Sequence, residues 1–148
     1  IIEGVTIPND VESIGKSAFD DCISLKKLTI PNSVIYIDDC AFMGCSALTE
    51  IVIPDSVIHI GDTVFYKCES LTEIIIPNSV VHIGDCAFFG CKSLTEITIP
   101  NSVFSIGWDA FYDCKSLESI YIDKEKDTLN LSKTNMPEKC KVYWRGEF

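Results

Sequence analysis

The sequence repeats itself with a period of 23 residues, and this periodicity limits the fold more than any other feature. A fixed period of roughly 20 to 50 residues is the signature of a solenoid, a propeller or a repeat array. The shared unit reads S-L-x-x-I-x-I-P-x-S-V-x-x-I-G-x-x-A-F-x-x-C. Three residue types mark the period most clearly, namely Pro8, Pro31, Pro54, Pro77 and Pro100, then Phe19, Phe42, Phe65, Phe88 and Phe111, then Cys22, Cys45, Cys68, Cys91 and Cys114.

Each copy of the unit predicts one coil of a solenoid. Residues 94–99 alternate apolar and polar side chains and stop at Pro100, as a short half-buried strand does. A second short extended piece ends at Gly107, and residues 110–114 fit one helical or 3₁₀ turn. Because one coil cannot bury its apolar side chains alone, successive coils must stack and place like residues side by side.

The strands of stacked coils should form one parallel sheet, with neighbouring strands about 4.8 Å apart. We expect them at residues 5–7, 28–30, 51–53, 74–76, 97–99 and 120–122. The pattern ends after Ile122, where a polar stretch at residues 123–127 replaces P-x-S-V. We therefore expect a repeat array of about five to six coils at residues 1–122 and a C-terminal cap at residues 123–148. No cap precedes the first coil, which predicts either further repeats or end-to-end self-association there.

The repeat resembles the BspA-type leucine-rich repeat, whose pattern residues 71–91 follow as L-T-E-I-I-I-P-N-S-V-V-H-I-G-D-C-A-F-F-G-C. The resemblance covers residues 2–122. It implies a leucine-rich-repeat solenoid with short parallel β-strands on the concave side, and short extended and helical or 3₁₀ turns elsewhere. Asp38 departs from the pattern in place of Gly, Val64 in place of Ala and Ala47 in place of Ser.

Proteins of this family are secreted or surface-attached adhesins of bacteria and of some parasitic protists. The resemblance therefore implies an extracellular or cell-surface location and a protein ligand, such as a host or microbial surface protein. It brings no catalytic residues with it. Fold alone does not name the ligand.

Composition narrows the function further. The net charge of −10 disfavours nucleic acid and anionic membranes as partners, because both attract clustered Lys and Arg. No apolar run approaches the ~20 residues of a transmembrane helix. No nucleophile elbow, zinc-protease motif or phosphate-binding loop is present, so we expect neither an enzyme nor a cofactor.

The repeated cysteines are expected to be buried, where a free thiol behaves as a small hydrophobe. Cys40 and Cys86 share a second repeat position, so a disulfide to Cys45 or Cys91 within the same coil stays open as an alternative. Zinc is disfavoured because no C-x-x-C spacing occurs. Cys140 has no counterpart in the repeats and is expected to be free.

The outward positions of the predicted strands are the first candidate for a binding face, because side chains alternate between the two faces of a strand. They combine a row of glutamates, a row of threonines and an apolar spot, and predict basic or hydroxyl-rich partners. A merely solvated sheet stays open as the alternative. The candidate residues are Lys27, Thr49, Glu50, Val52, Thr72, Glu73, Ile75, Thr95, Glu96, Thr98 and Tyr121.

Three weaker candidates lie elsewhere. A divalent cation could bind the stacked pairs His59, Asp62, His82 and Asp85, although a solvated edge explains them as well. Two apolar rows either close the core or, if exposed, mark an interaction patch, namely Met43, Tyr66, Phe89 and Tyr112, and Ile35, Ile58, Val81 and Phe104. The segment Asn130-Leu-Ser132 matches the acceptor sequence for N-glycosylation.

These observations together predict a non-catalytic, adhesin-like protein-binding module with an extended rigid face. The first alternative is a structural spacer within a larger surface protein. The second is divalent-metal-dependent binding at the stacked His and Asp residues.

Overall fold

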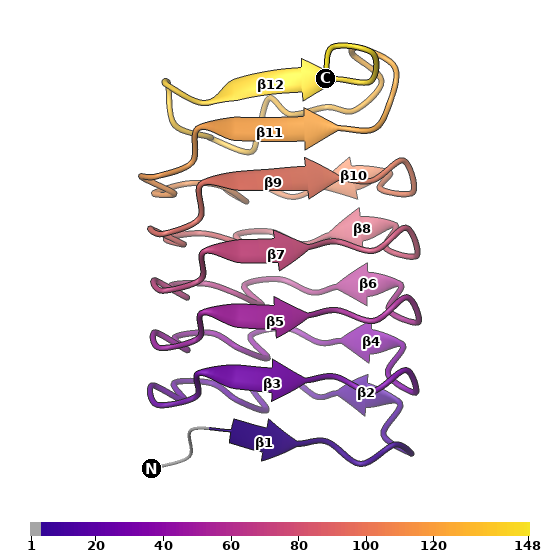
Figure 1. Ribbon diagram of the computed structural model, residues 1–148, viewed down its shortest axis with the longest axis vertical. Helices are drawn as coiled ribbons and strands as arrows, with labels where there is room; N and C mark the ends of the chain where they lie inside the picture. The colour runs from indigo at the N-terminus through magenta and orange to yellow at the C-terminus, as the bar shows by residue number, and fades with distance from the viewer. Residues whose placement is uncertain (1–3) are drawn as a thin grey trace.

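The computed structural model describes residues 4–148 as a column of stacked coils, one turn of chain above the next (Figure 1). One parallel sheet of seven strands, the long sheet, runs the length of the column. Its strands are β1 (Gly4–Thr6), β3 (Lys27–Thr29), β5 (Glu50–Val52), β7 (Glu73–Ile75), β9 (Glu96–Ile99), β11 (Ser119–Ile122) and β12 (Lys141–Trp144).

A second parallel sheet of five strands, the short sheet, uses the other extended piece of each coil. Its strands are β2 (Ser13–Ile14), β4 (Tyr36–Ile37), β6 (His59–Ile60), β8 (His82–Ile83) and β10 (Ser105–Ile106). Figure 1 shows them pointing opposite to the long-sheet strands, as expected when each coil turns back on itself. None of the described residues forms a helix that could span a membrane.

Residues one period apart pair directly in both sheets. Leu28 pairs with Ile51, and Ile51 with Ile74, in parallel register in the long sheet. In the short sheet His59 pairs with His82 in the same way. This register confirms the predicted parallel solenoid with its 23-residue period.

The six predicted strands of the long sheet begin one residue earlier than predicted. β1, β3, β5 and β7 also end one residue earlier than predicted, whereas β9 and β11 end where predicted. Proline explains the early end, because its nitrogen carries no hydrogen for the ladder. The pairing of Ile99 with Ile122 supports this explanation, because no proline follows Ile122. Asp123 occupies the proline position there, and its N–H donates to the Ile99 carbonyl at 3.0 Å, so pairing continues for one more residue.

The segment predicted as a helical or 3₁₀ turn is a series of tight turns in every coil, and the described residues contain no helix. Alternate N–H groups explain why. The Met43 N–H donates to the Cys40 carbonyl within its own turn at 3.1 Å. The preceding Phe42 N–H donates instead to the Val64 carbonyl of the next coil at 3.0 Å. A helix needs all of these donors inside one segment, so bonding between coils replaces it.

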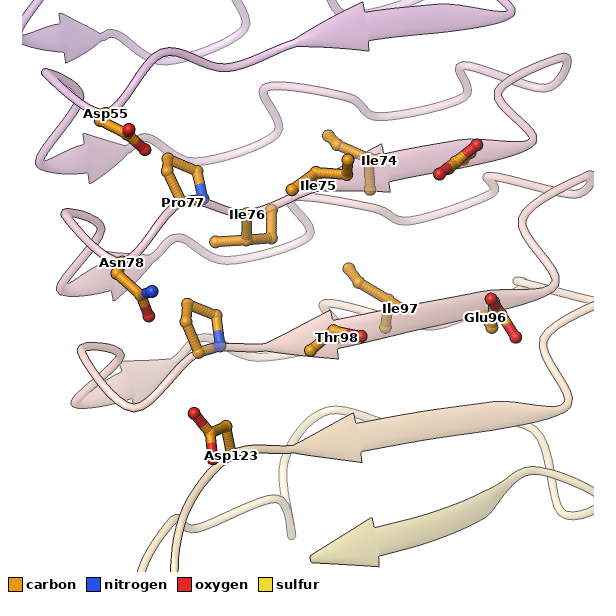
Figure 2. Close-up of a pocket in the computed structure, with 12 residues that line it drawn as sticks. Asp55, Ile74, Ile75, Ile76, Pro77, Asn78, Glu96, Ile97, Thr98 and Asp123 are labelled. Carbon is orange, nitrogen blue, oxygen red and sulfur yellow. The ribbon is translucent and has the colours of Figure 1, made fainter. Parts of the chain in front are cut away.

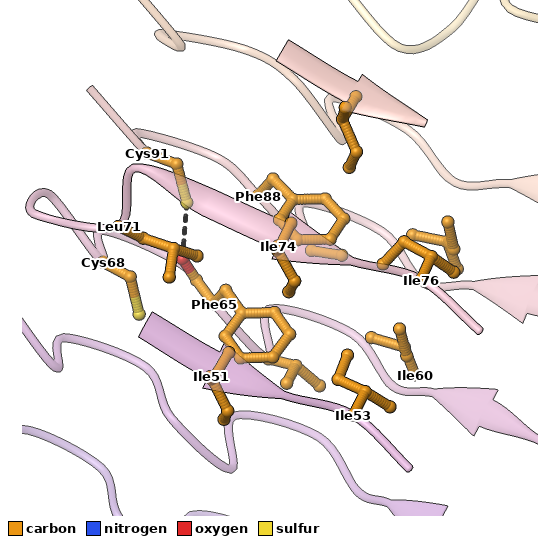
Figure 3. Close-up of a cluster of buried hydrophobic side chains, with 14 of the residues drawn as sticks. Ile51, Ile53, Ile60, Phe65, Cys68, Leu71, Ile74, Ile76, Phe88 and Cys91 are labelled. Atoms are coloured by element: carbon orange, nitrogen blue, oxygen red, sulfur yellow. Dashed lines mark hydrogen bonds between the residues drawn. The ribbon is translucent and has the colours of Figure 1, made fainter. Parts of the chain in front are cut away.

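A ladder of phenylalanines fills the centre of the column (Figure 3). Phe42, Phe65, Phe88 and Phe111 are fully buried. Ring centroids of Phe65 and Phe88 lie 5.6 Å apart with planes 11° from parallel. Identical rings stacked at the coil spacing pack directly on one another, which explains why one residue type recurs at this position.

A ladder of cysteines runs beside the phenylalanines, and Cys45, Cys68, Cys91 and Cys114 are buried as predicted. The prediction is wrong for Cys22, which is only half-buried because it lies in the first coil. Each thiol donates a hydrogen bond to a phenylalanine carbonyl of the preceding coil, as from Cys91 to Phe65 at 3.2 Å (Figure 3). Burial raises the pKa of the Cys45 and Cys114 thiols to about 12. The thiols therefore stay protonated near neutral pH, where they join the coils as donors.

The two ends of the column differ. In the first coil Val5, Val11 and Phe19 are only half-buried, whereas their counterparts in later coils are buried. At the other end β12 pairs with β11, and Leu129 and Trp144 are buried against the core. The division into an array and a cap at residue 122 stays a prediction, and residues 1–3 of that array lie outside the described part.

Candidate functional site

The predicted binding residues lie on the outer surface of the long sheet, here called the long-sheet face. In β5 and β7 the outward residues are exposed and the central residue is buried, as the alternation predicts. Val52 and Ile75 are 60% and 66% exposed. Two large aliphatic side chains so exposed, one above the other on neighbouring strands, form an apolar spot amid polar residues.

Not every outward residue is free to bind. The Thr72 hydroxyl donates to the Thr49 carbonyl at 3.4 Å, so the threonine row joins successive coils. The half-buried Tyr121 stacks on Tyr143, with ring centroids 5.3 Å apart. Phe148 meets the same ring edge-on at 5.3 Å. Tyr143 and Phe148 follow no repeat position, so only the structure reveals this aromatic group.

A groove of about 480 Å³ crosses the long-sheet face beside Ile75 (Figure 2). Its floor is apolar and its two ends are polar. It is lined by Asp55, Glu73, Ile74, Ile75, Ile76, Pro77, Asn78, Glu96, Ile97, Thr98, Pro100 and Asp123. Glu73, Ile75, Glu96 and Thr98 were predicted from the sequence, whereas Asp55, Asn78 and Asp123 were not. These three residues lie in the turns that follow the strands, where the alternation of side chains along a strand no longer predicts which way a side chain points.

The carboxylates of this face differ in their partners. Glu50 is paired with Lys27 at 3.3 Å, and Asp123 with Arg145 at 2.8 Å. Within residues 4–148 no cationic group lies within ion-pairing distance of Asp55, Glu73 or Glu96. The groove therefore carries three unpaired negative charges, which attract a cationic partner.

Two of the candidate metal residues, Asp62 and Asp85, accept hydrogen bonds between coils. The Asp62 carboxylate accepts the Asp85 N–H at 2.7 Å, and the Asp85 carboxylate accepts the Trp108 N–H at 2.7 Å. The His59 and His82 rings lie on the short sheet with centroids 6.3 Å apart. No group of three or more His, Cys, Asp or Glu side chains in the described chain is placed to hold a metal ion. The aspartates thus join coils by accepting backbone hydrogen bonds.

The same aspartate ladder explains why Asp38 replaces glycine. The position of Asp62 and Asp85 in the repeat is occupied by Lys16 in the first coil, and a lysine side chain cannot accept a hydrogen bond. The Asp39 N–H is instead accepted by the Asp38 carboxylate at 2.9 Å. In the next coil the Asp39 carboxylate accepts the Asp62 N–H, and the residue that corresponds to Asp38 is again a glycine, Gly61.

The two apolar rows are only partly covered. Met43, Tyr66 and Phe89 are half-buried, and the Tyr66 and Phe89 rings stack at 4.8 Å. Phe104 is 85% exposed and Tyr112 is 50% exposed, and Ile58 and Val81 are each 37% exposed, so the interpretation that these rows close the core is wrong for these four residues. One period after Phe104 and Tyr112 the chain has Asp127 and Asn135, which are polar and offer no apolar cover.

The glycosylation motif lies in a turn at the C-terminal end. Asn130 is exposed, and its side-chain oxygen accepts hydrogen bonds from the Ser132 N–H at 2.9 Å and the Ser132 hydroxyl at 2.7 Å. Modification of Asn130 stays a prediction.

The eight cysteines are free thiols in the structure. The Cys40 sulfur lies 3.0 Å from the Thr63 hydroxyl of the next coil and forms no disulfide within its own coil. Burial raises the pKa of the Cys86 and Cys140 thiols as well.

Solved structures of several bacterial proteins resemble this chain. A leucine-rich repeat protein of T. pallidum is 32% identical with a TM-score of 0.79, and the match covers 96% of this chain and 73% of that one. A leucine rich cell surface protein of Faecalibacterium prausnitzii is 37% identical with a TM-score of 0.82, covering 86% and 34%. The pneumococcal vaccine antigen PcpA is 27% identical with a TM-score of 0.81, covering 97% and 36%.

The chain thus spans well under half the length of the latter two proteins. No curated protein matches it. The model of the BspA type leucine rich repeat region matches residues 1–80 and 58–141, with six copies. Together with the 23-residue register of the coils, this match shows that the chain belongs to the BspA-type leucine-rich repeat family.

Proposed function

We propose that the chain is a non-catalytic protein-binding module of a surface-located, adhesin-like protein, and that the long-sheet face is its binding surface. The observation that carries the proposal is the pair of exposed aliphatic residues, Val52 and Ile75, beside the unpaired carboxylates of Glu73 and Glu96. A core of apolar contacts within a polar rim is the usual composition of a protein interface.

The rigidity of the coils supports the same function. Both sheets and the turns are joined from coil to coil by backbone hydrogen bonds, so the face is formed before a partner arrives. A preformed surface reduces the ordering cost of binding. The surface location rests on the similarity to the cell surface protein of Faecalibacterium prausnitzii.

Two other functions have less support. A pure spacer has no need of exposed Val52 and Ile75 at the centre of its sheet. Metal-dependent binding is disfavoured because Asp62 and Asp85 each accept a backbone hydrogen bond. Self-association through the first coil is a separate proposal, which rests on the half-buried Phe19 and is tested by sedimentation of the chain at increasing concentration.

The test is selection of a phage-displayed random peptide library on the immobilised chain, followed by affinity measurements on variants. Ile75→Asp adds a charge to the centre of the long-sheet face. Phe104→Asp is the matched control, because Phe104 is also a large exposed apolar residue but belongs to the short-sheet side of the column. Peptides that use the long-sheet face should bind the Ile75→Asp variant at least about tenfold more weakly, and the control equally well.

Two results would overturn the proposal. One is a selection that yields no binder, which would leave the spacer function. The other is a set of binders that lose affinity for Phe104→Asp but not for Ile75→Asp, which would move the interface to the short-sheet side.

A further inference from the structure

We infer that the groove beside Ile75 takes an extended segment of a partner protein with the pattern basic–x–apolar–x–basic. The inference rests on the proposed function and goes beyond it by naming the chemistry of the occupant. It follows from how charge and apolar surface are distributed along the groove.

The middle of the groove is apolar. Ile75 stands 66% exposed above a floor that includes the buried residues Ile76, Pro77 and Pro100. Figure 2 shows Ile75 and Thr98 between the two polar ends, on neighbouring strands. An aliphatic side chain of the partner would bury apolar surface against Ile75 here.

Both ends of the groove are acidic. Glu73 and Glu96 lie at the start of β7 and β9, and Asp55 lies beside Asn78 at the opposite end (Figure 2). None of these three carboxylates has an ion-pair partner among the described residues, whereas Glu50 and Asp123 at the margins are already paired. The negative charge is therefore divided between two ends, with apolar surface between them.

The separation of the two ends determines the spacing in the partner. Four to five residues of extended chain separate the row of Glu73 from the turn that holds Asn78, which is about 13 to 16 Å. In an extended segment, residues i, i+2 and i+4 lie on one face, and residues i and i+4 are about 13 Å apart. The long side chains of Lys and Arg span the remaining gap while their stems lie along the apolar floor.

The same geometry disfavours other occupants. On a helix, residues i and i+4 are only about 6 Å apart, so two basic residues at that spacing cannot reach both ends. An anionic segment is repelled at both ends. A basic segment without an apolar centre gains the charge contacts but leaves Ile75 in water.

Two synthetic peptides of one composition test the inference by fluorescence anisotropy with the whole chain. The first contains Lys-Ser-Leu-Ser-Lys, and the second contains Lys-Leu-Ser-Ser-Lys, which moves the leucine to the opposite face of an extended segment. We expect the first peptide to bind at least about fivefold more tightly, and this preference to disappear in the Ile75→Asp variant.

Charge-neutralising variants test the two ends separately. Glu73→Gln with Glu96→Gln, and Asp55→Asn alone, should each weaken binding of the first peptide by about threefold or more. Glu138→Gln, an exposed carboxylate of the C-terminal segment outside the groove, is the matched control and should leave binding unchanged. These amide substitutions keep the shape of each side chain, so folding is preserved.

Equal affinity for the two peptides, no binding of either at millimolar concentration, or no effect of Asp55→Asn would each overturn the inference. The proposed function has its own readout. If phage-selected peptides depend on Ile75 but lack the alternating basic and apolar pattern, the binding face stands and this occupant is wrong.

Discussion

Replacing Gly84 by alanine should destabilise the column, although the backbone conformation at this residue suits any amino acid. A Cβ atom placed on Gly84 would lie 2.5 Å from the Asp62 carboxylate and 2.5 Å from the carbonyl group of Gly61 in the preceding coil. Most of that contact is with backbone, which cannot move without separating the coils. Gly15 has the same repeat position, but a Cβ there would have nothing within 4 Å, so it offers a matched control.

The expected magnitude combines two opposing effects. Overpacking a tight contact costs about 1–3 kcal/mol. Replacing glycine by alanine also restricts the unfolded chain, which stabilises by about 0.4–1 kcal/mol. Gly84→Ala should therefore lower the free energy of unfolding by roughly 0.5–2 kcal/mol, and Gly15→Ala should leave it unchanged or raise it slightly.

Differential scanning calorimetry of the two variants beside the unchanged chain measures the difference. At about 2–4 °C per kcal/mol for a chain of this size, Gly84→Ala should lower Tm by about 1–8 °C. Melting temperatures are the proper comparison, because a solenoid can unfold coil by coil. Equal changes in Tm for the two variants would refute the reasoning, since the contact between coils is the only difference that matters here.

Three further predictions concern the ladders. Asp38→Gly should lower the free energy of unfolding by about 0.5–1.5 kcal/mol, because the Asp39 N–H loses its acceptor. Adding Lys16→Asp should restore that stability, and a double-mutant denaturation cycle in which the two effects simply add would contradict this. Since burial raises the pKa of the Cys114 thiol to about 12 from 9.0, the unfolded chain loses this proton first and stability falls as pH rises from 9 to 12. Cys114→Ser should flatten that decline in urea titrations, and an unchanged slope would exclude the thiol as its source. In the same titrations Phe88→Ala should lower the free energy of unfolding by about 3–5 kcal/mol, and Phe104→Ala by only about 0.5 kcal/mol, because Phe88 is buried and Phe104 is exposed. Equal losses of stability in the two variants would contradict this.

The sequence predicted the ladders well because a strict period leaves few ways to pack. Phe65 recurs at Phe88 and Phe111, and only parallel stacking puts such residues next to one another. The strand alternation also placed Glu73 and Ile75 on the outer face. These predictions needed no knowledge of distant contacts, because every contact between coils joins residues one period apart or close to it.

Other features depended on three-dimensional detail that the period does not carry. The turns were predicted as helical because the spacing of Ala110, Phe111 and Cys114 suits a helix, but the backbone N–H groups bond alternately to the next coil. The acidic end of the groove at Asp55 was missed because it lies beyond the strand, where alternation no longer indicates direction. The exposure of Phe104 was not predicted because the repeat ends after Ile122, and the residue one period after Phe104 is the polar Asp127.

Positions that break a ladder are where the function of such a column should be sought. A residue that recurs in every coil, such as the buried phenylalanine, is explained by stacking, since each copy packs on the last. The outward position of Thr29 becomes Val52, then Ile75, then Thr98. Stacking does not require this change, because all four side chains point away from the core. Val52 and Ile75 pair across neighbouring strands, which stabilises the sheet slightly, but they also keep apolar surface in water. This exposed apolar surface in the middle coils is what the proposed partner would cover.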